Sequence, residues 1–257
     1  MVPAGAGGSV DRGTLQGGSR YRRRDRLGNV AVGIRHAATP GFLRDRVDSN
    51  GKLLAEEHTI TGHLRNHFSV GPAILWAPFL GLAHAGVILA DAMGAQIPAT
   101  GYSRPYLAAM SASTVFYGFL GLLMAFDLAR RYAGDTWAFL ATLGIWFASS
   151  LPVYMYFNPA WSHAHSAFAV SLFLWYWQRT RDHRSLRQWI VLGMAAGLMM
   201  NVYYPNAILM IVPAIEALVE YYRTAPARWA RLLASHLFFL GMASLALLPT
   251  LVTRWII

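Results

Sequence analysis

Long apolar runs separated by short polar segments fill the sequence after residue 70. Most runs are roughly 17 to 25 residues long, which is the length that a helix needs to cross a bilayer. They are continuous and contain Gly and Ala, so they lack the alternation that marks transmembrane strands. The pattern predicts an all-α protein in which residues 71–257 form a polytopic bundle of about six or seven membrane helices. The expected helices are 71–93, 106–129, 137–156, 166–177, 188–203, 207–222 and 229–253.

Composition supports a membrane protein and weakens the alternatives. Hydrophobic residues make up 55% of the chain and charged residues only 13%, whereas a soluble domain carries about 25% charged residues. The net charge of +10 would suggest nucleic acid for a soluble protein, but eleven of the 22 basic residues lie before residue 70 and most of the others lie in short loops between apolar runs. We therefore expect a lipid bilayer as partner, and no nucleic acid. Without cysteine, the chain can form neither disulfides nor a thiolate metal site.

Arginine placement predicts the topology. After residue 70, nine arginines fall on one side of the expected helices and two, Arg104 and Arg254, fall on the other. The positive-inside rule makes the nine-arginine side cytoplasmic, which predicts a multi-pass protein of the cell (inner) membrane with cytoplasmic Arg-rich loops. The polar, tyrosine-rich loops 154–165 and 201–206 then share the outer face. The nine arginines are Arg130, Arg131, Arg179, Arg181, Arg184, Arg187, Arg223, Arg228 and Arg231.

The N-terminal part has a different character. Residues 1–50 are rich in Gly and Arg without apolar periodicity, which predicts a disordered, solvated segment. Binding of its Arg cluster to anionic lipid, and an origin in a misplaced start codon or a frame error, remain alternatives. Residues 51–70 form a polar loop, expected outside the cytoplasm, that leads into the apolar segment 71–93.

Two polar clusters are candidates for chemistry. The first is the break Asn158–Ser166 between apolar runs, which carries His163 and His165. Ionisable residues inside a membrane domain are functional candidates, although wet residues in an interfacial aromatic belt would look the same. The second cluster precedes residue 71. Its side chains suit acid–base chemistry, metal binding or phosphate binding, with a solvated loop as the alternative; they are Glu56, Glu57, His63, Arg65, Asn66 and His67.

Other polar or small residues have structural interpretations. Gly193, Gly197 and Asn201 recur at every fourth position and predict a smooth stripe for close helix packing. Asp127 precedes Arg130 and Arg131 by three and four residues, a spacing that favours an ion pair on one helix face.

The segment Thr59–Phe79, with the sequence TITGHLRNHFSVGPAILWAPF, resembles the first outer loop of C-type-fold membrane glycosyltransferases. These include protein mannosyltransferases and bacterial enzymes that add aminosugars to lipid A. The later order is also similar: a helix ending in Arg130-Arg131, the loop with His163 and His165, an Arg-rich turn, and then residues 193–205. The similarity covers about residues 50–257.

The resemblance implies transfer of a sugar from a polyprenyl-phosphate donor to an acceptor at the outer face. Sugar transfer needs a carboxylate base and groups that stabilise the departing phosphate. Glu56, Glu57 and Asp48 are the candidate bases, although the usual family base is an Asp after a first membrane span that this sequence does not show. No cofactor is certain, and a divalent metal at His163 and His165 is the one suggested. The candidate substrate-binding residues are His63, Arg65, Asn66, His67, Asn158, Trp161, His163, His165, Tyr203, Tyr204 and Asn206.

The missing span and the abrupt end at Ile257 lead us to expect a fragment of such an enzyme. In the family, the segment matching 71–93 is a juxtamembrane surface helix, whereas charge placement alone predicts an in-to-out span. The alternative function is a non-catalytic multi-pass protein that binds or carries a lipid or polysaccharide precursor. A secondary transporter would predict duplicated halves, and we find no internal repeat.

Overall fold

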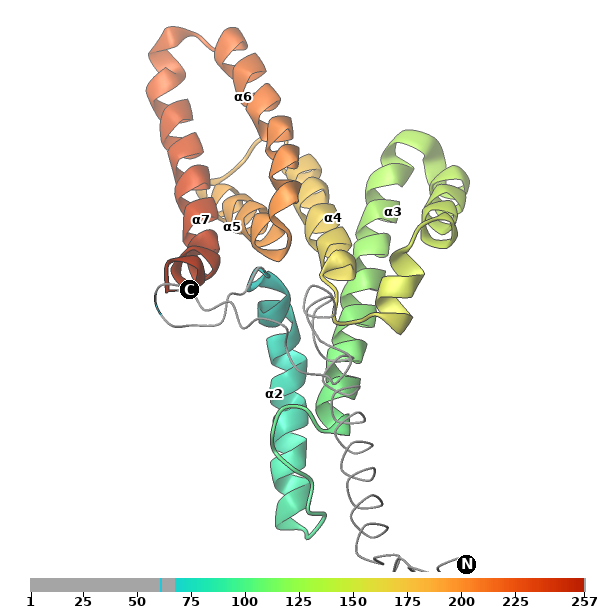
Figure 1. Cartoon of the computed structure of the whole chain (residues 1–257). Coiled ribbons are helices and arrows are strands. Elements are labelled where there is room, and N and C mark those ends of the chain that lie inside the picture. Colours follow the sequence, from blue (N-terminus) through green and yellow to red (C-terminus); the bar gives the residue numbers. More distant parts are fainter. Residues whose placement is uncertain (1–60, 62–67, 257) are drawn as a thin grey trace, which may run out of the picture. The chain divides into compact units, whose positions relative to one another are not determined.

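The computed structural model describes residue 61 and residues 68–256, and every regular element in this part of the chain is a helix (Figure 1). The predicted all-α class is confirmed. The segment 1–50 and nearly all of the polar loop 51–70 lie outside the described residues. The main helices are α2 (Gly71–Ala92), α3 (Arg104–Ala148), α4 (His163–Arg179), α5 (Leu186–Val202), α6 (Ile211–Arg223) and α7 (Trp229–Ile256), with short turns η2 (Val153–Phe157), η3 (Tyr204–Met210) and η4 (Pro226–Arg228).

Three helical stretches of the described chain are long and apolar enough to cross a membrane. They are Gly71–Ala92, Arg104–Ala148 and Pro226–Ile256, and α5 is a shorter apolar helix. The chain is a membrane protein, while the expected number of six or seven spans stays a prediction. Within α2, Leu82, Ile88 and Leu89 are all exposed; whether this helix crosses the bilayer or lies on its surface also stays a prediction.

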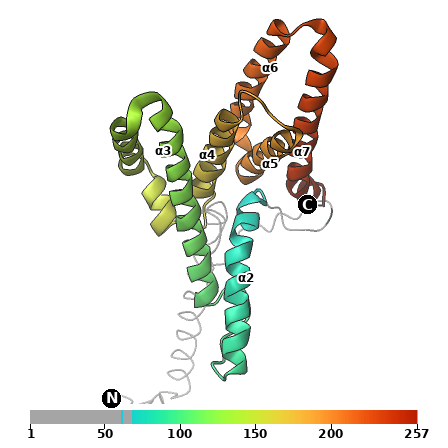
Figure 2. The same cartoon turned by 180° about the vertical axis from the view of Figure 1, so that it is seen from behind.

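A glycine divides the long helix α3. Gly134 has φ 74° and ψ 168°, a backbone conformation outside the helical region. Glycine adopts positive φ at little steric cost, so the chain reverses here and α3 folds back on itself (Figures 1 and 2). The break falls between the expected helices 106–129 and 137–156, just after Arg130-Arg131, as the sequence predicts.

The contact between α5 and α7 depends on the predicted stripe of small residues. A Cβ added at Gly193 would lie 2.5 Å from the carbonyl oxygen of Phe239, and one at Gly197 would lie 2.4 Å from that of Ala243. Asn201, the third member of the stripe, donates from Nδ2 to the Ala246 carbonyl at 3.2 Å and accepts from the Thr250 hydroxyl. The packing role predicted for these three residues is confirmed.

Polar side chains gather at two separate ends of this helix cluster. At the first, which we call the histidine end, the start of α4 (163–166), the loop 201–206 after α5 and the start of α2 (69–71) meet. At the second, the arginine end, the end of α4, the turn 180–185, the end of α6 and the start of α7 meet. The predicted separation of the outer loops from the Arg-rich turns is therefore present, and the cytoplasmic assignment of the arginine end stays a prediction.

Two carboxylates hold the arginine end together. Asp127 on α3 accepts from Trp175 Nε1 at 2.7 Å and pairs with Arg130 and Arg179, each at 2.9 Å. The predicted pairing of Asp127 with Arg130 is confirmed, and Arg179 takes the second position instead of Arg131. Glu216 on α6 repeats the pattern in a second cluster: it accepts from Trp177 Nε1 at 2.7 Å and from Arg184 Nη1 at 2.8 Å.

Candidate functional site

The ring of His163 lies at the centre of an aromatic cluster at the histidine end. His163 begins α4, and its ring centroid is 4.2 Å from that of Tyr154, which belongs to the π-helical turn η2. The Trp161 ring stacks on it at 5.7 Å with an interplanar angle of 17°, and Tyr203 meets it edge-on at 5.8 Å. Side chains from two loops about 40 residues apart therefore form one surface, as predicted from the charge pattern. We call Tyr154, Trp161, His163 and Tyr203 the aromatic cluster.

Asn206 attaches the loop 201–206 to the start of α4. Its Nδ2 donates to the Ser166 hydroxyl at 2.9 Å and to the Met199 carbonyl at 3.1 Å. Pro205 in η3 lacks a backbone donor and cannot continue α5, which ends at Val202. The Met199 carbonyl in the last turn of α5 accepts from both the Tyr203 backbone N–H and the Asn206 side chain. Tyr204, which is 72% exposed, extends the aromatic cluster toward solvent through its contact with Tyr203. Asn206 thus has a positioning role in the structure.

His165 is buried, unlike its neighbour His163. Its exposed fraction is 0%, and it packs against Trp76 at 5.5 Å and Tyr117 at 5.7 Å between ring centroids. Among the described residues, neither ring nitrogen has a hydrogen-bond partner. His165 lies in the first turn of α4, which is not among the candidate spans, and burial lowers the pKa of its imidazole to about 4. Its ring is therefore neutral at neutral pH and contacts the protein interior instead of the aromatic cluster.

A chain of hydrogen bonds ties the histidine loop to α2 and α3. Trp76 Nε1 on α2 donates to the Thr114 hydroxyl at 3.1 Å, and that buried hydroxyl lies 2.9 Å from the Pro159 carbonyl. Thr114 Oγ1 is also 3.0 Å from the carbonyl of Met110 on its own helix. One buried hydroxyl thereby connects α2, α3 and the loop that contains Asn158. Asn158 itself is partly buried at the end of η2, where its backbone N–H donates to the Val153 carbonyl at 2.9 Å.

The chain enters α2 beside the second loop. The Ser69 hydroxyl donates to the Val202 carbonyl at 2.9 Å, and a Cβ at Gly71 would lie 2.4 Å from the backbone of Asn201. Thr61, in the predicted polar loop, donates to the carbonyl of Ile256 at the end of α7 at 2.7 Å. Thr61 and Ser69, which lie on either side of 62–67 in sequence, therefore both attach near helix ends at or adjoining the histidine end.

Several predicted site residues cannot be placed. Among the described residues, the carboxylates of Asp127 and Glu216 are engaged in ion pairs at the arginine end, away from the aromatic cluster. The predicted bases Asp48, Glu56 and Glu57 all lie outside the described part of the chain. The unplaced candidates are Asp48, Glu56, Glu57, His63, Arg65, Asn66 and His67.

The histidines do not form a metal site with other described residues. Residues two apart on a helix point in different directions, and His163 and His165 have separate surroundings. Within the described ranges, no group of three or more His, Asp or Glu side chains is arranged to hold a metal ion. The described side chains on their own therefore do not form a binding site for the divalent metal that the sequence suggests.

Sequence reasoning missed the residues that support the aromatic cluster from behind. Trp76, Thr114 and Tyr117 lie inside long helices, where no local sequence pattern marks them. Their roles come from contacts with residues 38 to 48 positions away, which only the folded structure shows. Tyr154 lies in the predicted outer loop 154–165, but the sequence assigns it no individual role. Its place in that tyrosine-rich loop is the one local signal for it.

Comparison with known proteins gives the family. A family model described as dolichyl-phosphate-mannose-protein mannosyltransferase matches residues 107–255. The match includes the aromatic cluster and begins after the segment 59–79 that carries the resemblance described above. Neither the curated proteins nor the solved structures gave a match. Because the match spans more than half of the 257 residues, the chain belongs to the dolichyl-phosphate-mannose-protein mannosyltransferase family, a family of C-type-fold membrane glycosyltransferases.

Proposed function

We propose that this chain takes part in the transfer of a sugar from a polyprenyl-phosphate donor to an acceptor at the outer face of the cell (inner) membrane. The observation that carries the proposal is the aromatic cluster around His163, which two loops of the family-matched region form together. Family membership supports glycosyl transfer in general. The lipid-linked donor and the outer-face acceptor are our inference.

The aromatic cluster has the chemistry of a sugar-binding surface. Aromatic rings offer flat apolar faces, and Tyr and Trp add a polar group at the ring edge. A pyranose ring is complementary, since it has C–H groups on its faces and hydroxyls around its rim. Trp161 is 39% exposed and Tyr204 is 72% exposed, so both rings are accessible. His163 is partly buried and its ring contacts those of Trp161 and Tyr203, where a ring nitrogen can exchange a hydrogen bond with a sugar hydroxyl or a phosphate oxygen.

Transfer also requires a base and cationic groups. In the reaction, a carboxylate takes the proton of the acceptor hydroxyl, the hydroxyl oxygen bonds to the anomeric carbon, and the bond from that carbon to the phosphate oxygen breaks. We assign the base to one of Glu56, Glu57 or Asp48, and the phosphate contacts to Arg65 with His63, Asn66 and His67. The anchoring of Thr61 and Ser69 near the ends of α7 and α5 supports this assignment.

The same site supports a second candidate function, the binding or carriage of a lipid or polysaccharide precursor without catalysis. What favours it is that, among the described residues, no carboxylate forms a hydrogen bond or ion pair with the side chains of the aromatic cluster, and the ion pairs of Asp127 and Glu216 lie at the arginine end. A binding protein needs the aromatic surface and the bilayer, but it needs no base.

The test uses the full chain in vesicles supplied with a radiolabelled polyprenyl-phosphate hexose. Transfer to acceptor and donor binding are measured separately. We expect His163→Gln and Trp161→Leu to lower transfer at least about fivefold, because each removes a ring contact or a hydrogen-bonding group, worth roughly 1 kcal/mol or more. Trp137→Leu is the matched control, since Trp137 lies beyond the Gly134 break and is 69% exposed.

The outcomes separate the two functions. Equal transfer by Trp161→Leu and Trp137→Leu would exclude the aromatic cluster as the sugar site. Donor binding by the unaltered protein that depends on Trp161, with no transfer to any acceptor, would establish the second function in place of the first.

A further inference from the structure

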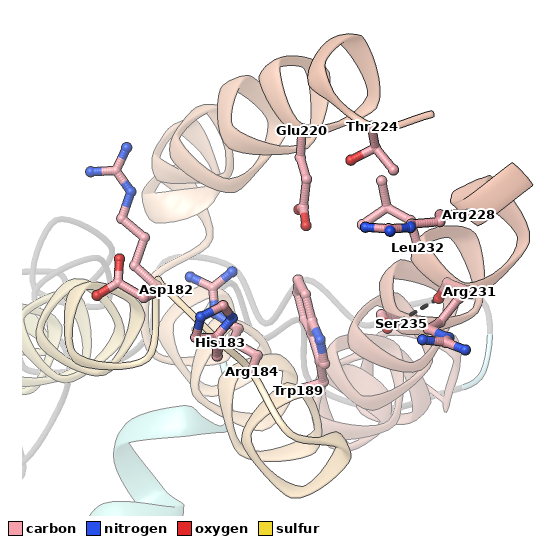
Figure 3. A pocket seen from close by; sticks show the side chains of 11 residues that line it. Asp182, His183, Arg184, Trp189, Glu220, Thr224, Arg228, Arg231, Leu232 and Ser235 are labelled. Atoms are coloured by element: carbon pink, nitrogen blue, oxygen red, sulfur yellow. Dashed lines mark hydrogen bonds between the residues drawn. The ribbon is translucent and has the colours of Figure 1, made fainter. Parts of the chain in front are cut away.

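A basic cavity at the arginine end is unused by the proposed sugar site. It has a volume of about 470 Å³ and lies between the start of α5, the end of α6 and the start of α7. Figure 3 shows Glu220 and Thr224 reaching into it from α6, with Trp189 on the opposite side and Arg228 and Leu232 beside them on the α7 side. We call this space the arginine cavity. Its arginines are Arg181, Arg184, Arg228 and Arg231.

The charges around the arginine cavity do not balance. Arg184 is satisfied, because its side chain is 3% exposed and pairs with Glu216, and its guanidinium lies 4.8 Å from the Trp189 ring centroid. By contrast, Arg228 and Arg231 form no ion pair with any side chain in the described part of the chain. The four lining arginines face two lining carboxylates, Asp182 and Glu220, and Glu216 lies behind them. One positive charge is left in excess.

The arginine cavity lies at the end of a candidate membrane span. Arg228 lies within the candidate span Pro226–Ile256, at its first residues, where a membrane helix meets the headgroup layer. Figures 1 and 2 show α6 and α7 joined by the turn at η4 and separating from there. Apolar side chains on both helices are exposed beyond that turn, among them Leu218 (71%) on α6 and Leu237 (58%) on α7. A headgroup in the cavity can therefore keep its acyl chains along apolar surface.

We propose that the arginine cavity binds the phosphate of an anionic phospholipid headgroup, with Arg228 and Arg231 as its principal ligands. Guanidinium groups bind phosphate oxygens through paired, charge-assisted hydrogen bonds. A phosphate diester carries one negative charge and so neutralises the single excess charge. A phosphate monoester carries about 1.5 to 2 and would overcompensate beside Glu220. The proposal does not depend on sugar transfer, and it concerns the end of the molecule opposite the aromatic cluster.

The test measures lipid binding to the purified full chain in detergent micelles by native mass spectrometry. Phosphatidylglycerol, phosphatidylcholine and free glycerol 3-phosphate are added separately. We expect one phosphatidylglycerol to bind more tightly than phosphatidylcholine. The double variant Arg228→Gln/Arg231→Gln should bind it about 30-fold more weakly, from the usual contribution of two basic residues at a membrane surface. The matched control Arg131→Gln/Arg187→Gln removes the same charge from residues that do not line the cavity and should change binding less than about threefold.

A further variant guards against misfolding of the double variant. Thr224→Trp fills the arginine cavity from α6 without changing any charge, so it should also abolish tight phosphatidylglycerol binding. Equal weakening by the control pair would show that general surface charge is responsible and would overturn the proposal. Displacement of phosphatidylglycerol by an equal concentration of glycerol 3-phosphate would identify a soluble phosphate ester as the ligand and overturn the lipid assignment.

Discussion

Gly197 offers a sharp test of how α5 and α7 pack. In Gly197→Ala, the new methyl carbon would lie 2.4 Å from the Ala243 carbonyl oxygen and 2.5 Å from the Ala246 Cβ. Carbon atoms in contact lie about 3.5 to 4.0 Å apart, so one helix must shift by about 1 Å. The nearest obstacle is backbone, which cannot rotate away. We expect a cost of about 1 to 3 kcal/mol, as for other overpacked cores.

The matched control is Gly241→Ala on α7. No atom lies within 4 Å of a Cβ added there, and alanine is favoured over glycine in a helix interior by about 1 kcal/mol. Because this gain applies equally to Gly197→Ala, the two variants should differ by the overpacking cost alone, about 1 to 3 kcal/mol, or roughly 2 to 12 °C in Tm. Thermal unfolding in one detergent, followed by tryptophan fluorescence, measures this difference. Adding Ala246→Gly to Gly197→Ala should recover only part of the loss, because the backbone contact remains.

A Gly197→Ala protein as stable as Gly241→Ala would refute the close approach of α5 and α7. It would mean that the small residues at 193 and 197 permit a wider helix separation than the structure has. Full recovery by Ala246→Gly would also contradict the reasoning, since it would place the whole clash on the Ala246 side chain and none on the Ala243 carbonyl.

Two further predictions concern ionisable groups. The pKa of the His165 imidazole falls on folding from its ordinary value of 6.5 to about 4. The unfolded state therefore binds more protons between these values, and stability should fall as the pH drops through that window, by about 3 kcal/mol in all. Thermal unfolding of His165→Phe should lack this acid-dependent loss, and an unchanged pH profile would contradict it. Glu216→Gln should lower the free energy of unfolding by about 3 kcal/mol, because it leaves the buried charge of Arg184 without its partner. Chemical unfolding measures this loss, and the control Glu220→Gln, one turn further along α6, should show little change. Similar losses in both variants would refute the role of the ion pair.

The features that the sequence predicts correctly are periodic or compositional. The spacing of Gly193, Gly197 and Asn201 is a local pattern, and it identifies the face of α5 that meets α7. The Arg130-Arg131 pair before Gly134 marks the reversal within α3. The distribution of arginines between the expected helices also predicts that the two tyrosine-rich loops lie at the same end of the bundle. No single residue in either loop predicts this.

The features that the sequence does not predict depend on partners distant in the chain. Trp175 and Asp127 are 48 positions apart, and an indole in an apolar run gives no sign that it will donate to a carboxylate. The burial of His165 is a similar case. Its position next to Trp161 and His163 suggests an exposed loop residue, whereas the start of α4 turns it toward Trp76 and Tyr117. Helix phase, which depends on where the helix begins, decides the difference between the two histidines.

The two indole contacts of α4 also fix that helix against rotation. Trp175 and Trp177 are two residues apart and reach opposite neighbours, Asp127 on α3 and Glu216 on α6. Turning α4 about its own axis in either direction would pull one of these hydrogen bonds apart. The rotation of α4 about its axis is thus fixed at its last turns. Because His163 is in the first turn of the same helix, its direction is fixed as well. Any movement of the His163 side chain relative to its neighbours must then come from the loops around it, because α4 itself does not rotate.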